Sequence, residues 1–327
     1  MSSNIENKKK LHKLLARLAP KVGAKFIVEP EWGVAAQMVY SNGVVRSFLG
    51  YLLDLNGIAS TGISTDKSHA KFFMSKLGYP VAEGKTIFEN SWAKEMQSNR
   101  KILYAIKYAK SLGYPVIVKP NSKSKGWGVC LVWNKHELRA ALREVFKEDK
   151  VAIVERYLPG RDYRIVVLDG EIISAYERTP LSVIGDGRSS ILHLLKRKIL
   201  LLSKESIKID LKDRRIKLKL KRSGYTFKTI LPKNKKLYLL DSANLSSGGD
   251  MIEATRTISS GFKKIAIKLT KDMGLRFSGV DLMITRGDIA KNPKVCGYYI
   301  IEINSSPGLA PAEEKYLKIL RILGKKE

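Results

Sequence analysis

Two apolar runs near the end of the chain carry acidic and amide side chains at fixed places, and this pattern constrains the fold most. The run at 279–282 reads Gly-Val-Asp-Leu, and the run at 300–308 reads Ile-Ile-Glu-Ile-Asn-Ser-Ser-Pro-Gly. Glu302 and Asn304 are two residues apart, so on a strand they share one face. With Asp281 they offer hard oxygen ligands, which suit Mg²⁺ together with water and substrate phosphates. The alternative is a hairpin whose polar residues are merely solvated.

The totals are those of a soluble globular protein. With 327 residues, 44% hydrophobic and 28% charged, the chain can form two or three domains or subdomains around a sizeable core. Cys130 and Cys296 lie far apart, with neither disulfide nor zinc spacing, which predicts a reducing, cytoplasmic location. The four histidines occur singly, so no metal or triad role is expected for them. No apolar run reaches membrane-spanning length, and no signal-peptide core is present.

The net charge of +29 and the pI near 9.9 are extreme for a cytoplasmic protein. Such a field attracts polyanions, namely nucleic acid, anionic membrane, nucleotides or acidic peptides. Alternatively, the chain comes from a lysine-biased proteome and much of the excess charge is merely solvated. Both interpretations remain open.

Helical and strand patterns alternate along the chain. Residues 5–19 predict a basic amphipathic helix, either bound to a membrane surface or, as we favour, packed on the domain behind it. Asp66 can cap a helix over 66–77. Asn56-Gly57 and Thr61-Gly62 indicate loops, and Asp169-Gly170 a hairpin turn. Further helices are expected at 102–112, 136–147, 189–202 and 257–273, and strands at 26–28, 44–48, 116–120, 151–154, 164–168 and 171–176.

A lysine-rich insert occupies 204–240, with strand-like alternation at 216–220 and 237–240. No long linker divides the chain. The order of elements predicts an α+β fold with largely antiparallel sheets.

Lys119 ends a buried apolar strand and precedes a polar loop with two glycines, at 121–128. A strand-end ammonium beside the backbone amides of a Gly/Ser loop can hold phosphate. The Gly-Lys-Ser/Thr ending of a Walker loop is missing. A Gly/Ser turn within a hairpin explains the loop equally well.

The segment 151–164 runs from an apolar strand into Glu155, a Pro-Gly turn and a second acid, Asp162. A bare strand edge can offer its backbone N–H and C=O groups to adenine, and an acid beyond the turn can accept from ribose hydroxyls. A surface loop with unremarkable acids is the alternative when the segment is considered alone.

Taken together, these segments resemble the ATP-grasp ligases, and within them the ATP-grasp modules of cyanophycin synthetase and of bifunctional glutathione synthetase. The resemblance runs from about residue 56 to 310. Its motifs, in order, are Tyr-Pro-Val-Ile-Val-Lys-Pro at 114–120, Val-Glu-Arg-Tyr-Leu-Pro-Gly at 154–160 with Asp-Tyr-Arg at 162–164, Val-Ile-Gly-Asp-Gly at 183–187, Ala-Asn-Leu-Ser-Ser-Gly-Gly-Asp at 243–250, and the two runs described first.

The resemblance implies an ATP-grasp fold, in which two α+β subdomains grip ATP between them. These would span 66–156 and 157–327, after an N-terminal region at 1–65. It also implies roles in ATP binding. Phosphates would be held by Lys67, Lys119 and the loop residues Ser124, Gly126 and Gly128, adenine by Glu155 with the backbone of Arg156 and Leu158, and ribose by Asp162.

The resemblance further implies that Asp281, Glu302 and Asn304 hold two Mg²⁺ ions or, in their place, Mn²⁺. Replacing either acid by its amide is expected to leave the fold intact. Arg164 and Arg178 would face the reaction centre. The loop that contains Asn244, Ser246, Ser247 and Gly248 would offer backbone N–H groups to a carboxylate or acyl phosphate.

The function implied is ATP-dependent ligation of a carboxylate to an amine through an acyl phosphate, on an amino acid or acidic peptide. This chemistry needs no nucleophilic side chain, and neither polymer nor glutathione synthesis is carried over. The alternative is an inactive ATP-grasp scaffold that binds nucleic acid or a membrane surface. The acids at 281, 302 and 304 argue against inactivity, and the lack of interleaved aromatics at 196–222 argues against base stacking. The two substrates and homo-oligomerisation remain open.

Overall fold

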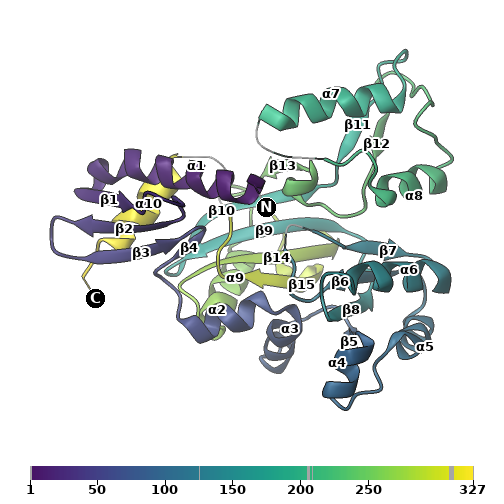
Figure 1. Cartoon of the computed structure of the whole chain (residues 1–327), viewed down its shortest axis with the longest axis horizontal. Helices are drawn as coiled ribbons and strands as arrows, with labels where there is room; N and C mark the ends of the chain where they lie inside the picture. Colours follow the sequence, from purple (N-terminus) through teal and green to yellow (C-terminus); the bar gives the residue numbers. More distant parts are fainter. Residues whose placement is uncertain (1, 125, 205–206, 208, 309–312, 327) are drawn as a thin grey trace.

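The structure is a computed structural model that describes residues 2–124, 126–204, 207, 209–308 and 313–326. In these residues the strands form one five-stranded sheet, two four-stranded sheets and a two-stranded ribbon, and neighbours within each run antiparallel (Figure 1). The α+β class expected from the sequence is therefore confirmed. Among the helices of this described part, none combines the length and hydropathy needed to cross a bilayer.

The five-stranded sheet is the centre of the molecule, with the order β13-β10-β9-β14-β15. Alternate residues of its strands face two different cores. Ile165 and Val167 pack with the covering helices α2, α3 and α9, whereas Val166 and Leu168 pack with the N-terminal sheet. The bounds are β9 (Arg161–Leu168), β10 (Glu171–Thr179), β13 (Asp250–Glu253), β14 (Phe277–Arg286), β15 (Gly297–Asn304), α2 (Ile58–Thr65), α3 (Lys67–Lys76) and α9 (Ser260–Asp272).

The N-terminal sheet, β1 to β4, packs with the two terminal helices around one hydrophobic core, as Figure 1 shows at its left. Leu15 and Leu18 of the first helix are fully buried in this core. The amphipathic helix expected at 5–19 thus packs on the domain behind it. The elements are α1 (Ser2–Leu18), β1 (Ala24–Val28), β2 (Ala35–Tyr40), β3 (Val45–Leu49), β4 (Leu52–Leu53) and α10 (Glu313–Leu323).

The second four-stranded sheet has the order β5-β8-β6-β7 and buries its apolar side chains against α5 and α6. The helix expected at 102–112 is confirmed at both ends. Asn134 caps α6 by accepting from the amides of His136 and Glu137, which starts that helix. The bounds are β5 (Gly84–Phe88), α4 (Asn90–Glu95), α5 (Ile102–Leu112), β6 (Val116–Pro120), β7 (Cys130–Val132), α6 (Lys135–Val145) and β8 (Val151–Arg156).

The lysine-rich segment expected at 204–240 is part of a larger unit, residues 180–249, which is called the basic insert from here on. Its described side chains from Leu181 to Leu240 form a hydrophobic core of their own. Its elements are β11 (Ser182–Ile184), α7 (Ile191–Lys204), α8 (Arg214–Arg222) and β12 (Lys236–Tyr238). Short 3₁₀ turns at Leu245–Ser247, Ala19–Val22 and Pro293–Val295 complete the described elements.

Two local predictions are wrong. The alternation at 216–220 predicted a strand, but the segment is helix α8, because Asp213 caps it and Ile216 and Leu220, four residues apart, are the side chains it buries. Thr61 and Gly62 were expected in a loop but lie inside α2. The elements that were not predicted are strands β2, β4, β5, β7, β11 and β13 and helices α4 and α10.

Candidate active site

A cleft of about 2400 Å³ lies between the five-stranded sheet, the sheet of β5–β8 and the basic insert. Every residue that the sequence analysis proposed for a site lines it, except Gly248. The N-terminal region also contributes to the wall, through Lys8, Leu49, Tyr51 and Leu52, which no local pattern had singled out. The topology thus gathers motifs from distant parts of the sequence around one space.

A buried ion-pair triad lies on one wall. Glu155 on β8 is 4% exposed, and its Oε1 accepts from Lys119 Nζ of β6 at 2.6 Å. Its Oε2 accepts from Lys71 of α3. Burial raises the pKa of the Glu155 carboxyl, but the two ammonium groups outweigh that effect and lower the pKa to about 2. Glu155 therefore holds two cations at the wall.

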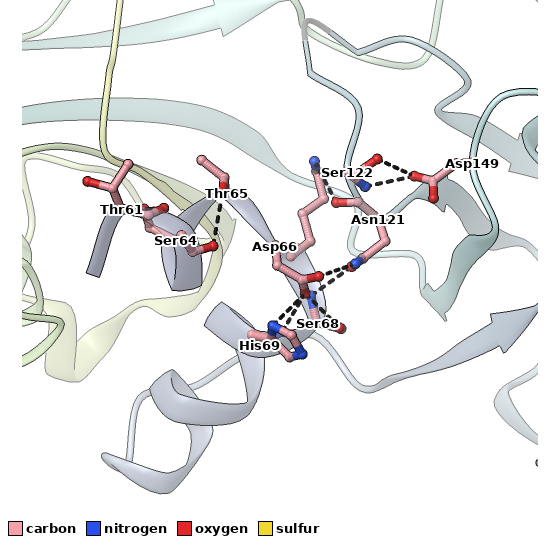
Figure 2. A network of polar contacts seen from close by, with 11 residues as sticks. Thr61, Ser64, Thr65, Asp66, Ser68, His69, Asn121, Ser122 and Asp149 are labelled. Carbon is pink, nitrogen blue, oxygen red and sulfur yellow. Dashed lines mark hydrogen bonds and ion pairs between the residues drawn. The ribbon is translucent and has the colours of Figure 1, made fainter. Parts of the chain in front are cut away.

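The start of the glycine-containing loop, at Asn121, is held by the first turn of α3. Asp66 caps that helix by accepting from the His69 amide at 2.8 Å, and its other oxygen accepts from Asn121 Nδ2 at 2.6 Å. Asn121 Oδ1 in turn accepts from the Ser68 amide at 2.9 Å. Figure 2 shows how these side chains join helix and loop. This network positions the loop relative to the helix.

Two further contacts hold the residues after Asn121. Lys67 Nζ donates to the carbonyl of Lys123 at 2.6 Å. The Ser122 amide and hydroxyl both donate to Asp149 Oδ2, at 2.8 and 2.9 Å (Figure 2). Lys67 was expected to hold phosphate, and here its ammonium group holds the loop backbone.

The opposite wall carries a compact arginine–aspartate cluster. Arg164 on β9 pairs with Asp281 of β14 through two hydrogen bonds, of 2.7 and 2.8 Å. Arg178 on β10 donates to Asp281 at 2.9 Å and to Asp162 at 2.5 Å. Asp281 is only 3% exposed, and burial opposes its ionisation, yet the two guanidinium groups lower its pKa. Asp162 differs, because burial dominates and its pKa is raised.

Glu302 and Asn304 lie beside this cluster on β15. Asp281 pairs with Glu302 in the β-sheet register, and Gly279 pairs with Asn304. With its amide oriented to satisfy both atoms, Asn304 donates to Glu302 Oε1 at 2.8 Å and accepts from Arg164 Nη2 at 3.1 Å. The three oxygen-bearing side chains therefore lie on two paired strands and line the same cleft.

This donor set fits Mg²⁺, which prefers a few carboxylate and amide oxygens and keeps water on its other positions. Within the described residues, no three His, Cys, Asp or Glu side chains converge, so the protein offers two acids and one amide. Both Asp281 oxygens are paired with arginines here, whereas Glu302 forms no ion pair in the described part. Thr179 Oγ1 and Ser305 Oγ, both from cleft-lining residues, are buried and lack partners among the described residues.

Two expected backbone roles need correction. The Arg156 amide donates to Glu83 O at 2.8 Å, so this N–H group already has a partner, and contact of the Arg156 carbonyl with adenine stays a prediction. The amides of Ser247, Gly248 and Gly249 donate to carbonyls of the same turn, at Asn244 and Leu245, and do not point to a substrate. Gly248 faces apolar side chains of the insert, because a Cβ there would lie 2.5 Å from Ile209 Cδ1.

Lys71 is the main site residue that sequence reasoning missed. It lies one helical turn beyond Lys67, and an i, i+4 lysine pair in a predicted helix was a usable signal. Asn121 and Asp149 gave no comparable signal, because their partners lie 55 and 27 residues away.

Two family profiles match the chain. Residues 73–186 match the D-Ala–D-Ala ligase C-terminus, and residues 241–321 match the RimK-like ATP-grasp domain. These two ranges leave residues 187–240, which contain most of the basic insert, between them.

Individual relatives agree with these profiles. The chain is 30% identical to cyanophycin synthetase of Trichormus variabilis over 301 residues, 88% of this chain and 30% of that protein. It is 31% identical over 257 residues to a glutathione biosynthesis bifunctional protein of Streptococcus mutans, 75% of this chain and 32% of that protein. The chain thus spans about 30% of the length of these relatives.

Solved structures show the same fold. A bifunctional glutathione synthetase from Pasteurella multocida superposes with a TM-score of 0.55 at 26% identity, over 90% of this chain and 40% of that one. D-alanine–D-alanine ligase from Bacillus anthracis gives a TM-score of 0.50 at 18% identity, over 82% of this chain and 68% of that one, which bears on the fold alone. With both profiles and these relatives in agreement, the chain belongs to the ATP-grasp superfamily.

Proposed function

We propose that the chain is an ATP-dependent carboxylate–amine ligase that forms an amide bond through an acyl phosphate. The observation that supports this most is the pair of charged walls of one cleft. Lys119 lies on one wall, and Arg164 lies with Asp281 and Glu302 on the other. The relatives are named as synthetases and ligases. We also propose the subdomain boundaries expected above, at 66–156 and 157–327.

In the proposed reaction, a substrate carboxylate oxygen attacks the γ-phosphorus of ATP. The bond from phosphorus to the β–γ bridging oxygen breaks, and ADP leaves with that electron pair. An amine nitrogen then attacks the acyl carbon, phosphate leaves, and the nitrogen loses a proton. Such catalysis consists mainly of positioning and charge stabilisation.

The chain supplies both. Glu155 holds the Lys119 ammonium group at a fixed place on the wall, where it can bind phosphate oxygens. Asp281 and Asp162 hold Arg164 and Arg178 rigidly, so their positive charge is preorganised for negative charge that develops in the reaction. Magnesium bound by Glu302, Asn304 and Asp281 would neutralise charge on the phosphates. Leu158 and Asp162 remain our candidates for adenine and ribose.

A direct test is ADP release with a panel of amino acids and acidic peptides, with mass spectrometry of the products. We expect release that depends on Mg²⁺ or Mn²⁺ and on both a carboxylate and an amine. Lys119→Ala should raise the Kd for ATP by at least about tenfold, since it removes a charged hydrogen bond to phosphate. Tight binding of DNA or anionic vesicles, without ADP release from any pair of substrates, would instead support the inactive scaffold.

The substrate is proposed to be acidic, because the insert presents cations to the cleft. Lys212 and Arg214 are exposed and line it. The alternative is that the basic face is solvated and does not bind substrate. Two pairs of basic residues on the insert distinguish substrate docking from this alternative, because only one pair lines the cleft. Lys217 and Lys221 on α8 are also exposed but do not line the cleft.

We therefore expect Lys212→Glu with Arg214→Glu to raise the KM for an acidic peptide by about tenfold or more. Lys217→Glu with Lys221→Glu, which changes the net charge equally, should raise it much less. The wild-type KM should rise steeply between about 50 and 300 mM salt, as the Debye length shrinks from about 14 to about 6 Å. Equal effects of the two pairs, or a salt-independent KM, would contradict docking at the cleft.

A further inference from the structure

Helix α8 of the insert reaches the glycine-containing loop through one guanidinium group. Arg215 Nη1 donates to the carbonyls of Gly126 and Val129, at 3.0 and 3.3 Å. Its Nε and Nη2 are paired with Asp213, at distances from 2.7 to 3.1 Å. The guanidinium is thus already shared between the carboxylate that orients it and the loop backbone.

The helix that carries Arg215 is itself fixed. Ile216 and Leu220 of this helix are buried in the insert core. Arg222, seven residues after Arg215 and therefore on the same face, donates to Glu137 of α6 at 2.5 Å. Helix α8 therefore bridges the insert and the sheet of β5–β8, with its arginine face on the loop side.

The loop is also confined on its other side. Gly126 has φ +70°, and a Cβ there would lie 2.1 Å from Asn244 Nδ2. The first residue of the loop, Asn121, is anchored to α3 as described above. Arg215 thus supplies a side-chain contact to the carbonyls of Gly126 and Val129 in the second half of the loop.

We propose that Arg215, oriented by Asp213, is a positioning residue for the nucleotide site and acts through the carbonyls of Gly126 and Val129. It fixes the loop before the nucleotide arrives and does not itself contact phosphate. The proposal rests on the proposed function only in that this loop binds phosphates.

The first test needs no activity, because it measures amide hydrogen exchange in the nucleotide-free protein. The Trp127 and Val129 amides donate to Ser124 O and Gly126 O, at 3.2 and 3.4 Å, within the loop. We expect Arg215→Ala to speed exchange at both amides by about tenfold or more, whereas Lys217→Ala, on the same helix, should not. Unchanged exchange in Arg215→Ala would overturn the proposal.

Two conservative variants guard against a general folding defect. Arg215→Lys keeps the charge but cannot reproduce the planar fork, so it should behave like Arg215→Ala. Asp213→Asn keeps a good N-cap for α8 while weakening the hold on Arg215, so it should give an intermediate effect. Exchange at wild-type rates in both variants would also contradict the proposal.

Calorimetry with ATP then separates positioning from direct contact. We expect Arg215→Ala and Arg215→Lys to raise the Kd alike, by about tenfold, because restoring charge without geometry does not restore the loop. Wild-type affinity in Arg215→Lys alone would show direct phosphate binding and overturn the proposal. If the wild-type protein binds no nucleotide, the proposed function fails, and the exchange experiment still decides the role of Arg215.

Discussion

Replacing Asp281 with Asn is expected to lower turnover by about a hundredfold or more and to destabilise the fold as well. The loss of turnover corresponds to roughly 3 kcal/mol of transition-state stabilisation. The loss of stability arises because Asp281 is buried and neutralises both Arg164 and Arg178. Removing one partner of a buried ion pair typically costs about 3–5 kcal/mol. Urea unfolding and ADP release would measure the two effects.

From the sequence we expected the fold to survive replacement of either Asp281 or Glu302 by its amide. For Asp281 the structure leads us to expect a loss of stability instead. Glu302 provides the matched comparison, because it forms no ion pair within the described residues. Glu302→Gln should lower turnover to a similar extent while the free energy of unfolding changes by less than about 1 kcal/mol. Normal turnover in Glu302→Gln would refute its metal role, and equal stability of the two variants would refute the structural role of Asp281.

The second large effect is expected at Glu155. Glu155→Gln leaves the ammonium groups of Lys71 and Lys119 close together on a buried wall without their counter-charge. We expect the free energy of unfolding near pH 7 to fall by about 3–5 kcal/mol. Glu144→Gln is a suitable control, since its partner Lys147 is an exposed neighbour on the surface and such pairs contribute at most about 1 kcal/mol.

The lowered pKa of Glu155 determines how the stability difference between wild type and Glu155→Gln changes with pH. The pKa of Glu155 is lowered to about 2 in the folded state, from an ordinary value of 4.5. Its ion pairs therefore contribute fully above pH 4.5 and are lost as the pH falls toward 2, where the carboxyl becomes protonated. The stability difference between wild type and Glu155→Gln should shrink over this window. A difference that stays constant from pH 6 to pH 3 would contradict the charged triad.

The sequence predicted the parts of the site that depend on local pattern. Asp281 and Glu302 each lie within an apolar run, and these two runs form the paired strands β14 and β15. Lys119 was likewise marked by the strand it ends. The cap at Asp66 and the turn at Asp169-Gly170 are also local, and the structure confirms both.

What the sequence could not predict depends on packing between distant segments. The pairing of Arg164 and Arg178 with Asp281 joins residues 117 and 103 positions apart, and no periodicity reports such a contact. Lysines and arginines alternating with Ile216, Leu218 and Leu220 gave a period of two. A helix formed instead, because two of these apolar side chains are four residues apart and only one face meets the insert core.

The insert begins and ends at neighbouring positions of one ladder, since Thr179 of β10 pairs with Asp250 of β13. The intervening 70 residues are therefore a long insertion between two paired strands, β10 and β13. Their described side chains form a hydrophobic core separate from that of the central sheet. The entropic cost of closing such an insertion depends only weakly on its length, at about 0.6 kcal/mol for each doubling. Evolution can lengthen, shorten or exchange this segment at little thermodynamic cost to the central sheet. Substrate preference could thus diverge in this segment while the nucleotide-binding sheets stay the same.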